Sequence, residues 1–370
     1  MEKPLRTLTI NPGSTSTKIA LFDDMEPLFI SLIEHSIDDL KDFDEIQDQL
    51  LYRTKTVEQA MADNGYLLES VDVFAGRGGG IVPVSGGTYI VCDLMADHAA
   101  RAMSGGPHPA QLAPQIAKQF ADKFGKKAIV VNPPDVDEFC DFARVSGIKG
   151  LYRESHIHAL NQKEAALRFC ASRGVSYDDV NLVICHIGGG ISVTAHCKGA
   201  MTDSNDIING SGPMTPTRAG DLPYMKVIDL AYSGEYTKKE LSDKLNKHGG
   251  LISHFGTSSV REIMKKIENG DKYAELIIGG MIYQIAKNAG AMAASLKGEV
   301  DAIIITGAIA DNAYFTDALT EYLGWITEIV VMPNEFELEA LAAGALRIMR
   351  GEEMTKTYTG IPVWYGFEEL

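Results

Sequence analysis

Two short segments rich in glycine and hydroxyl side chains hold the residues best suited to binding a phosphate. The first reads Ile-Asn-Pro-Gly-Ser-Thr-Ser-Thr-Lys over residues 10–18, and the second reads His-Ile-Gly-Gly-Gly-Ile-Ser over residues 186–192. Glycine lets the backbone turn tightly and present N–H groups, while Ser and Thr add neutral donors. Because β-rich runs flank both segments, the sequence predicts one phosphate-binding β-hairpin used twice.

The first segment matches neither of two common nucleotide-binding loops. A Walker loop requires Gly before the Lys and Ser or Thr after it, where this chain has Thr17 and Ile19. A Rossmann fingerprint requires spaced glycines that open a helix, whereas a strand is expected after Gly13. With these two loop types excluded, the segment is predicted to be a β-hairpin. Its candidate phosphate-binding side chains are Asn11, Ser14, Ser16 and Lys18.

The second segment has three consecutive glycines, Gly188, Gly189 and Gly190. A purely structural hairpin rarely contains three, because each glycine in a strand costs about 0.5–1 kcal/mol. We interpret the run as a place where backbone N–H groups approach a polyphosphate. A third motif, residues 306–312, predicts a strand-to-helix turn with an acidic cap against which a nucleoside rests; its candidate residues are Gly307, Asp311 and Asn312.

Two isolated arginines next to glycine-rich turns, Arg77 and Arg218, are candidates for stabilising a transferring phosphoryl group. Phosphoryl transfer needs cations and donors around three equatorial oxygens, and a planar guanidinium suits that task. The alternative for either arginine alone is an ion pair with a surface carboxylate. His108 and His158 can donate hydrogen bonds to a phosphoryl oxygen, although a structural role is the alternative for a lone histidine.

Composition limits the classes of partner. A formal net charge of −16 argues against nucleic acid and anionic membranes, whose binding proteins display basic patches. Five cysteines without CxxC spacing fit a reduced compartment, and the chain has neither an apolar leader nor an uninterrupted apolar span. We therefore expect a cytoplasmic protein with small-molecule ligands.

The order of the predicted elements indicates an α/β protein of two domains, which a chain of 370 residues can form. Strands are expected over 5–33, 71–75, 127–132, 181–195, 300–306 and 328–332, and helices over 38–64, 110–124, 155–171, 241–270, 275–297 and 335–349. In the helix over 275–297, apolar residues at 278, 282, 285, 289, 292 and 296 form one stripe, which predicts a core-facing side. Two successive sets of hairpin, strands and helices suggest duplication of one unit.

Taken together, these motifs resemble the acetate and butyrate kinase family, a branch of the acetate kinase, sugar kinase, heat-shock chaperone and actin fold. Phe-Ala-Gly-Arg-Gly-Gly-Gly, His-Ala-Leu-Asn-Gln-Lys and Thr-Pro-Thr-Arg-Ala-Gly-Asp occur in the family's order between the phosphate motifs. The length is closer to the butyrate kinase branch. The resemblance implies two duplicated ribonuclease-H-like, actin-like ATPase domains with a nucleotide cleft between them, over residues 1–140 plus 345–370 and over 141–344.

The resemblance also implies a reaction in which ATP and a short-chain carboxylate such as butyrate or a branched acid give ADP and an acyl phosphate by direct in-line transfer. In this reading Arg77 and Arg218 hold the carboxylate and the migrating phosphoryl group. His158 donates to that group, and His108 is a second active-site histidine. His186 belongs to the second phosphate motif. Ser259 and Arg261 align with the segment beside the adenine.

Magnesium is the metal that the resemblance implies. Asn11 would lie near the γ-phosphate and this ion, and Glu337 is the expected late glutamate near it, with Glu335 as the alternative. Asn132 stands where the family commonly has an Asp. An amide oxygen can bind magnesium but brings no charge, so Asp135 or a water-mediated contact is the alternative.

Other functions remain open from the sequence. One alternative is an acetate or propionate kinase of the same family, another is an ATP-driven, chaperone-like binding module, and a third is an inactive relative suggested by Asn132. A homo-oligomer, dimer or higher, is expected from the resemblance. The sequence does not identify the preferred acid, the direction of the reaction or the acyl pocket, for which Val82, Val84 and residues 213–214 are guesses.

Overall fold

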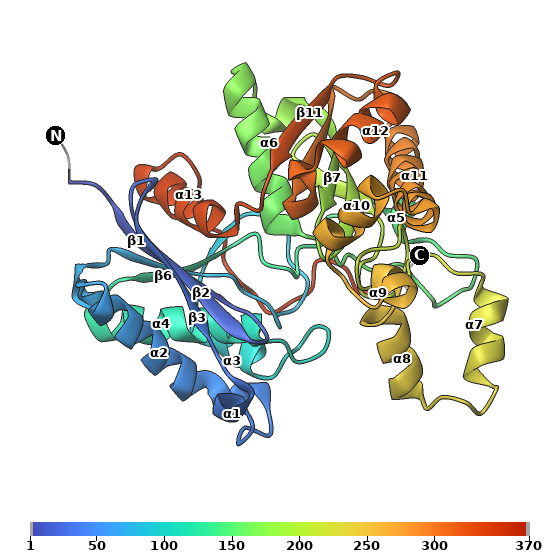
Figure 1. Ribbon diagram of the computed structural model, residues 1–370. Coiled ribbons are helices and arrows are strands. Elements are labelled where there is room, and N and C mark those ends of the chain that lie inside the picture. The colour runs from blue at the N-terminus through green and yellow to red at the C-terminus, as the bar shows by residue number, and fades with distance from the viewer. Residues whose placement is uncertain (1–2, 368–370) are drawn as a thin grey trace. The chain divides into compact units, whose positions relative to one another are not determined.

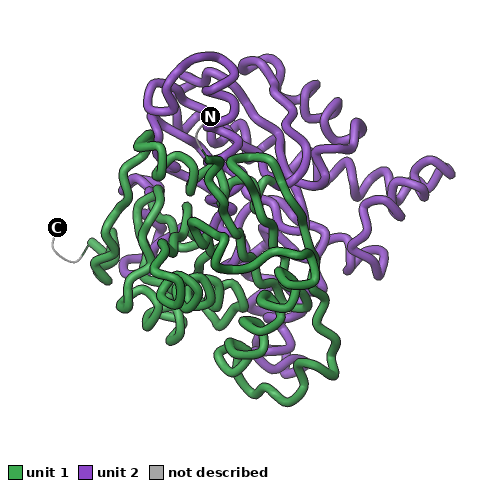
Figure 2. The backbone as a smooth tube through the Cα atoms, turned by 90° about the vertical axis from the view of Figure 1, so that its left-hand side faces the viewer, with its two compact units in different colours: residues 1–137, 336–370 green, residues 138–335 purple. Residues whose placement is uncertain are grey.

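The computed structural model describes residues 3–367 and divides the chain into two compact units. Unit 1 comprises Met1–Asp137 and Phe336–Leu370, and unit 2 comprises Glu138–Glu335 (Figure 2). The sequence analysis placed the corresponding boundaries after residues 140 and 344. The second boundary therefore lies before the last long helix rather than within it, so that this helix belongs entirely to unit 1.

Unit 1 is a mixed sheet with helices on both faces (Figure 1). Its strands are β1 (Arg6–Pro12), β2 (Ser16–Asp23), β3 (Glu26–Glu34), β4 (Val73–Gly76), β5 (Thr88–Ile90) and β6 (Lys127–Val131). Its α-helices are α1 (Ile37–Leu40), α2 (Leu50–Asp63), α3 (Asp93–Ala100), α4 (Leu112–Phe124) and α13 (Glu337–Arg350). Short 3₁₀ turns are η1 (Ile46–Gln49), η2 (Leu68–Ser70) and η3 (Pro109–Gln111).

The strand order in unit 1 is β3-β2-β1-β4-β6-β5. Strands β1 to β3 form an antiparallel meander, and β1, β4 and β6 are parallel, so the carboxyl ends of β1 and β4 lie at one edge. Helix α13 covers one face, where Leu338 and Ala342 pack against Ala20 and Phe22 of β2. Helix α4 covers the other face, as Figure 1 shows.

Unit 2 has the same kind of architecture, with a mixed sheet in the order β11-β10-β7-β8-β9. Its strands are β7 (Asn181–Ile187), β8 (Ile191–Cys197), β9 (Ala200–Ser204), β10 (Ala302–Gly307) and β11 (Ile329–Pro333). Its α-helices are α5 (Asp141–Arg144), α6 (Ala159–Arg173), α7 (Tyr224–Ala231), α8 (Lys238–Asn246), α9 (Gly250–Phe255), α10 (Val260–Glu268), α11 (Lys272–Ser295) and α12 (Ala313–Leu323). Two 3₁₀ turns are η4 (Tyr177–Asp179) and η5 (Ala308–Asp311).

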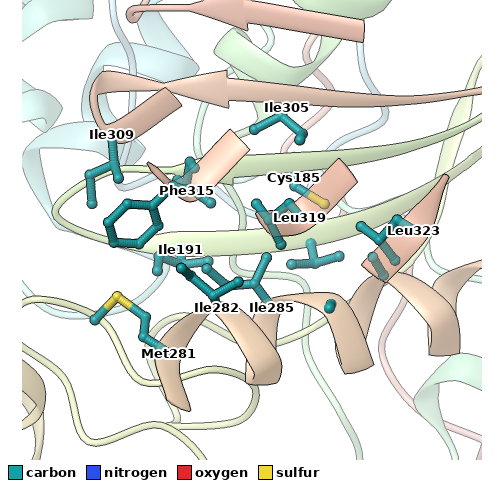
Figure 3. Packing of buried hydrophobic residues seen from close by; sticks show 14 of the residues in the cluster. Cys185, Ile191, Met281, Ile282, Ile285, Ile305, Ile309, Phe315, Leu319 and Leu323 are labelled. Atoms are coloured by element: carbon teal, nitrogen blue, oxygen red, sulfur yellow. The ribbon is translucent and has the colours of Figure 1, made fainter. Parts of the chain in front are cut away.

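The main core of unit 2 lies between its sheet and helices α11 and α12. Alternate residues of β7, β8 and β10 point to this side, because successive strand residues face opposite sides of a sheet. The apolar stripe predicted over 275–297 is confirmed, since all six of its positions are buried, five of them in α11 and Leu296 at its C-cap. Figure 3 shows sheet residues of this core, including Cys185, Ile191 and Ile305, with Met281, Ile282, Ile285, Phe315, Leu319 and Leu323 of the two helices.

Helix α6 covers the opposite face of this sheet, where Phe169 packs with Leu182 and Ile184. The helix begins at Ala159 rather than at residue 155, with His158 as its N-cap. The single helix expected over 38–64 is divided into α1, η1 and α2, and Ser36 and Asp39 form a capping box that begins the first piece. Among the described residues, no helix is long and apolar enough to cross a membrane.

Candidate active site

Three of the predicted site residues meet in unit 1 at the carboxyl ends of β1 and β4. The Asn11 amide Nδ2 donates to Glu337 Oε2 at 2.7 Å, and Arg77 Nε donates to Glu337 Oε1 at 3.4 Å. Glu337 is the first residue of α13, so the Glu337 carboxylate also lies at the positive end of that helix. The late glutamate expected from the sequence therefore binds both the asparagine and the arginine.

The backbone of β4 fixes the direction of Arg77. A Cβ on Gly76 would lie 2.8 Å from the backbone of Ala113 in α4, so glycine permits the close approach of this helix. The following residue, Arg77, is held by a bond from its N–H to Ile10 O at 2.9 Å. The Arg77 side chain is only 8% exposed, and its buried Nη1 has no hydrogen-bond partner among the described residues.

The unpartnered Nη1 indicates a site for an anion. A buried donor without a partner costs about 1–3 kcal/mol, and more when the group is charged. An oxygen of a carboxylate or phosphoryl group would satisfy it with a charge-assisted hydrogen bond. Glu337 occupies Nε, so the remaining edge of the Arg77 guanidinium is available to a ligand.

The first phosphate hairpin is shaped by a buried arginine that the sequence analysis did not consider. Gly13 N donates to Ser16 O at 2.7 Å and closes the turn. Beneath it, the fully buried Arg53 of α2 donates to Ser16 O at 3.2 Å, Ser14 O at 3.4 Å and Thr17 Oγ1 at 3.0 Å. The acceptors of Arg53 among the described residues, including Gln49 Oε1, are all neutral, and burial lowers the pKa of Arg53.

Three of the predicted hairpin residues, Asn11, Ser16 and Lys18, lie on the side of the hairpin opposite Arg53. Asn11 pairs with Lys18 across the ladder, so both side chains lie on the face that α13 covers. Ser14 and Lys18 are exposed, and Ser16 is half-buried.

His108 is the N-cap of η3. The Ala110 N–H donates to His108 Nδ1 at 3.1 Å, so the proton of the neutral ring is on Nε2. Desolvation lowers the pKa of His108, and the positive charges of Arg77 and Arg53 lower it further. His108 is therefore a neutral donor near Arg77 when no anion is bound.

Asn132 and Asp135 have different surroundings, although both follow β6. Asn132 has a left-handed φ of 39° and is buried, and its Oδ1 accepts from Gly87 N at 2.7 Å. Asp135 accepts from the Ser104 hydroxyl, while its buried Oδ2 has no partner among the described residues. Burial raises the pKa of Asp135 to about 6, with smaller opposing effects from Ser104 and Arg77.

In unit 2, His158 and His186 lie together at the second hairpin. Their rings stack with centroids 4.1 Å apart and an interplanar angle of 22°. Asn161 Nδ2 lies 2.9 Å from His186 Nδ1, so that nitrogen accepts and the neutral ring has its proton on Nε2. His186 Nε2 is 3.8 Å from Glu335 Oε1, so this alternative metal residue belongs to the histidine pair in unit 2.

The glycines of the second hairpin provide space rather than three equivalent donors. Gly188 N donates to Gly190 O at 3.0 Å, so the Gly188 N–H closes the turn. The expectation that this N–H approaches a phosphate is therefore wrong. A Cβ on Gly190 would lie 2.6 Å from Arg218 Nη1 and 3.1 Å from His158 Nε2. The hydrogen atom in place of that side chain leaves His158 and Arg218 facing a common space.

The loop that holds Arg218 packs against two glycines, Gly249 and Gly250, which lie within the range 241–270 expected to be helical. Arg218 N donates to Thr215 Oγ1 at 2.9 Å, and Thr215 N donates to Arg218 O at 3.0 Å. Gly250 has a φ of 52°, and a Cβ there would lie 1.7 Å from Thr215 O. Burial lowers the pKa of Arg218, and its guanidinium has no hydrogen-bond partner among residues 3–367.

The predicted adenosine motif packs on the second hairpin. Gly307 ends β10 with a φ of 98°, and a Cβ there would lie 2.5 Å from Ile187 O. The expected acidic cap is corrected: Asp311 ends η5, and the neutral Asn312 caps α12 by accepting from Tyr314 N at 3.0 Å. Ser259 likewise caps α10, and Arg261 is exposed on its first turn.

Comparison with known proteins agrees with this architecture. Solved structures that share it include acetate kinase from Porphyromonas gingivalis, with a TM-score of 0.75 at 18% identity over 93% of this chain and 100% of that one. A propionate kinase from Francisella tularensis has a TM-score of 0.73 at 16% identity over 92% and 98%. These likenesses place the chain in the actin-like ATPase fold class and confirm the predicted α/β fold.

Relatives found by sequence similarity share a higher identity with this chain than these structures do. A protein named probable butyrate kinase 2 from Caldanaerobacter subterraneus subsp. tengcongensis is 41% identical over 353 residues, which cover 95% of this chain and 99% of the relative. A probable butyrate kinase from Listeria monocytogenes serotype 4a is 39% identical over 351 residues, with the same coverage. The acetokinase family profile matches residues 154–325. The chain belongs to the acetokinase family, as its motifs predicted.

Proposed function

We propose that the protein is a short-chain carboxylate kinase that converts ATP and butyrate, or a branched short-chain acid, to ADP and the acyl phosphate. The observation that carries the proposal is the buried Arg77 guanidinium beside Asn11 and Glu337, whose Nη1 has no hydrogen-bond partner within residues 3–367. The names of the two sequence relatives support butyrate as the acid.

The residues of the site fit a reaction without a general base. A carboxylic acid has a pKa of about 4 to 5, so the nucleophile is already ionised at neutral pH. Catalysis then requires orientation of the carboxylate and stabilisation of charge on the phosphoryl oxygens. We assign these tasks to Arg77 in unit 1 and to Arg218 and His158 in unit 2, with His108 as a further donor.

The nucleotide groups divide between the two units. In unit 1, Asn11, Ser14, Ser16 and Lys18 would bind the terminal phosphate. In unit 2, His186 and residues 188–190 would bind the rest of the polyphosphate, and Gly307, Asp311, Asn312, Ser259 and Arg261 would contact the nucleoside. Gly189 and Gly190 contribute backbone donors in this proposal, because Gly188 N–H is used within the turn.

Magnesium fits the oxygen donors of unit 1. The Glu337 carboxylate and the Asn11 amide oxygen are hard ligands of the kind that this ion accepts together with substrate phosphates. Within residues 3–367, no cluster of three or more His, Cys, Asp or Glu is suited to hold a metal, so substrate oxygens would complete the coordination. When bound, magnesium would neutralise charge on the phosphates. Asn132 remains a weaker candidate because its Oδ1 accepts from Gly87 N.

The test is carboxylate-dependent formation of ADP, with hydroxylamine used to trap the acyl phosphate. Acetate, propionate, butyrate and isobutyrate are compared at equal concentrations, because one methylene changes binding by about 1–3 kcal/mol in an apolar pocket. We expect the largest kcat/KM for butyrate or isobutyrate. ATP hydrolysis that does not depend on any of these acids would contradict the proposal.

A further inference from the structure

The polar residues of β8 form one end of a buried hydrogen-bond path to His158. Ile191, Val193 and Ala195 face the main core, so Ser192, Thr194 and His196 face α6, and all three are fully buried. Gln162, in the first turn of α6, is also fully buried and lies between Ser192 and His196. Because these groups have no access to water, each donor and acceptor must be satisfied by a protein group.

The Ser192 carbonyl determines the orientation of the Gln162 amide. Gln162 Nε2 lies 3.2 Å from Ser192 O and 2.7 Å from Ser192 Oγ. A carbonyl oxygen can only accept, so the amide nitrogen and not its oxygen must face Ser192. Gln162 Oε1 therefore faces His196 Nε2 at 2.9 Å, and that ring nitrogen must donate.

The opposite nitrogen of His196 has a donor of its own. The Tyr177 hydroxyl lies 2.6 Å from His196 Nδ1. Burial holds the pKa of His196 well below its usual value, and the nearby Lys163 ammonium lowers it further, so the ring is neutral. With its proton on Nε2, His196 accepts from Tyr177 at Nδ1 and donates to Gln162 at Nε2.

Ser192 donates the last hydrogen bond of the path, to the His158 ring. Its Oγ accepts from Gln162, and in the described part of the chain the one acceptor that its hydroxyl proton reaches is His158 Nδ1 at 2.8 Å. A buried hydroxyl that did not donate would lose a hydrogen bond. His158 Nδ1 therefore accepts, and the ring has its proton on Nε2, the nitrogen that faces the open side of Gly190 together with Arg218.

We infer that Tyr177, His196, Gln162 and Ser192 are positioning residues, which hold His158 in the tautomer that presents an Nε2–H donor at the second hairpin. Every hydrogen bond of the path runs in one direction, from the Tyr177 hydroxyl to the His158 ring. The inference deepens the proposed function and rests on it for the identity of the acceptor, a transferring phosphoryl oxygen. The tautomer itself follows from the hydrogen bonds within unit 2.

The direct test is ¹⁵N NMR of the histidine rings in the full-length protein without nucleotide, with His158 assigned by comparison with His158→Gln. We expect a protonated Nε2 and an unprotonated Nδ1 in the wild type. A protonated Nδ1 in neutral His158 would overturn the inference. This measurement requires no activity, so it separates failure of the inference from failure of the proposed function.

The kinetic test removes one hydroxyl from the path. Ser192→Ala should lower kcat by on the order of tenfold to a hundredfold, because groups that orient a catalytic ring have effects of this size, while KM for ATP and butyrate stays near wild type. The matched control is Ser204→Ala, which removes a buried hydroxyl of β9 that bonds Val193 O and Thr194 outside the path. Equal kcat in the two variants would overturn the inference.

A second variant reverses the path without removing it. In Gln162→Glu, at a pH high enough to ionise this buried carboxyl, both side-chain oxygens accept, so Ser192 would donate to residue 162 instead of to His158. His158 would then have to donate from Nδ1, and the ¹⁵N spectrum should show that change together with a loss of kcat. An unchanged His158 tautomer in folded Gln162→Glu, with the ionisation of residue 162 confirmed by the carboxyl ¹³C shift, would contradict the direction that we assign.

Discussion

Two arginines of the site have guanidinium groups that carboxylates do not fully satisfy. Arg77 is bound to Glu337 at Nε but not at Nη1, and Arg218 has no hydrogen-bonded partner for its guanidinium among the described residues. Since a buried or half-buried guanidinium stays charged, these side chains prepare the units for anions despite the net charge of −16. The donors for anionic ligands are therefore local, as the composition led us to expect.

At this scale, Arg77→Ala and Arg218→Ala should each lower kcat of acyl phosphate formation by on the order of a hundredfold or more. This is the usual cost of losing a charged partner of the transition state. The control is Arg6→Ala, because Arg6 is paired at 2.8 Å with both oxygens of Asp23 at the other end of β1. Normal turnover in either site variant, with hydroxamate product measured at saturating ATP, would exclude that arginine from the reaction.

At the scale of elements, the glycine hairpins and their neighbours were predictable in part. Alternation of apolar residues predicted the two hairpins and the buried stripe of α11, because both signals depend on local spacing. The same alternation of apolar and polar residues in β8 is typical of a strand with one face exposed to solvent. Helix α6 buries that polar face, so the path through Gln162 and Ser192 depends on a packing that local spacing does not encode.

The loop around Arg218 illustrates the same limit. Its position depends on Gly249 and Gly250, more than thirty residues later in the chain, where any Cβ would meet the backbone of the loop. The sequence predicted only helical structure over 241–270 there. Arg53 and Asn161 were likewise missed, because each acts through a partner distant in sequence.

Gly190 provides a prediction for the second hairpin as an element. Gly190→Ala should reduce kcat/KM by on the order of a hundredfold, because its methyl group would displace Arg218 Nη1 and the His158 ring, and small misplacements of catalytic groups have costs of this size. Gly290→Ala in α11 is the control, since a Cβ there meets nothing within 4 Å. If both variants keep wild-type kcat/KM, the space at Gly190 is not part of the site.

At the scale of the whole molecule, buried neutral histidines make folding sensitive to acid. Burial lowers the pKa of His35 to about 4, and it holds the pKa of His196 well below 6.5. Below pH 6.5 the unfolded chain binds protons that the folded chain does not, so stability falls as the pH falls. Each histidine contributes about 1.4 kcal/mol per pH unit. Asp135, with its pKa raised to about 6, has the opposite sign and offsets part of this loss between about pH 6 and 4.

Urea unfolding at pH 7.5, 6.5 and 5.5 should therefore show decreasing stability, and His35→Gln should make the decrease shallower. The glutamine can still bond Thr17 or Tyr52, the two partners of His35, but it does not titrate. A pH dependence identical to that of the wild type would mean that His35 is protonated in the folded protein. Measurement of the His35 pKa by NMR would then show directly whether burial lowers that pKa in the folded protein.

The hydrogen bonds from Arg53 to the first hairpin determine how long a segment must be to keep the shape of its turn outside this protein. The carbonyls of Ser14 and Ser16 are held by the side chain of Arg53 in α2, and Arg53 lies nineteen residues after the end of the β1–β3 meander. A graft of β1 and β2 alone onto a foreign scaffold would therefore lack the group that shapes its turn. A transplantable phosphate-binding module from this chain has to extend through α2, and that extension brings an internal positive charge with it.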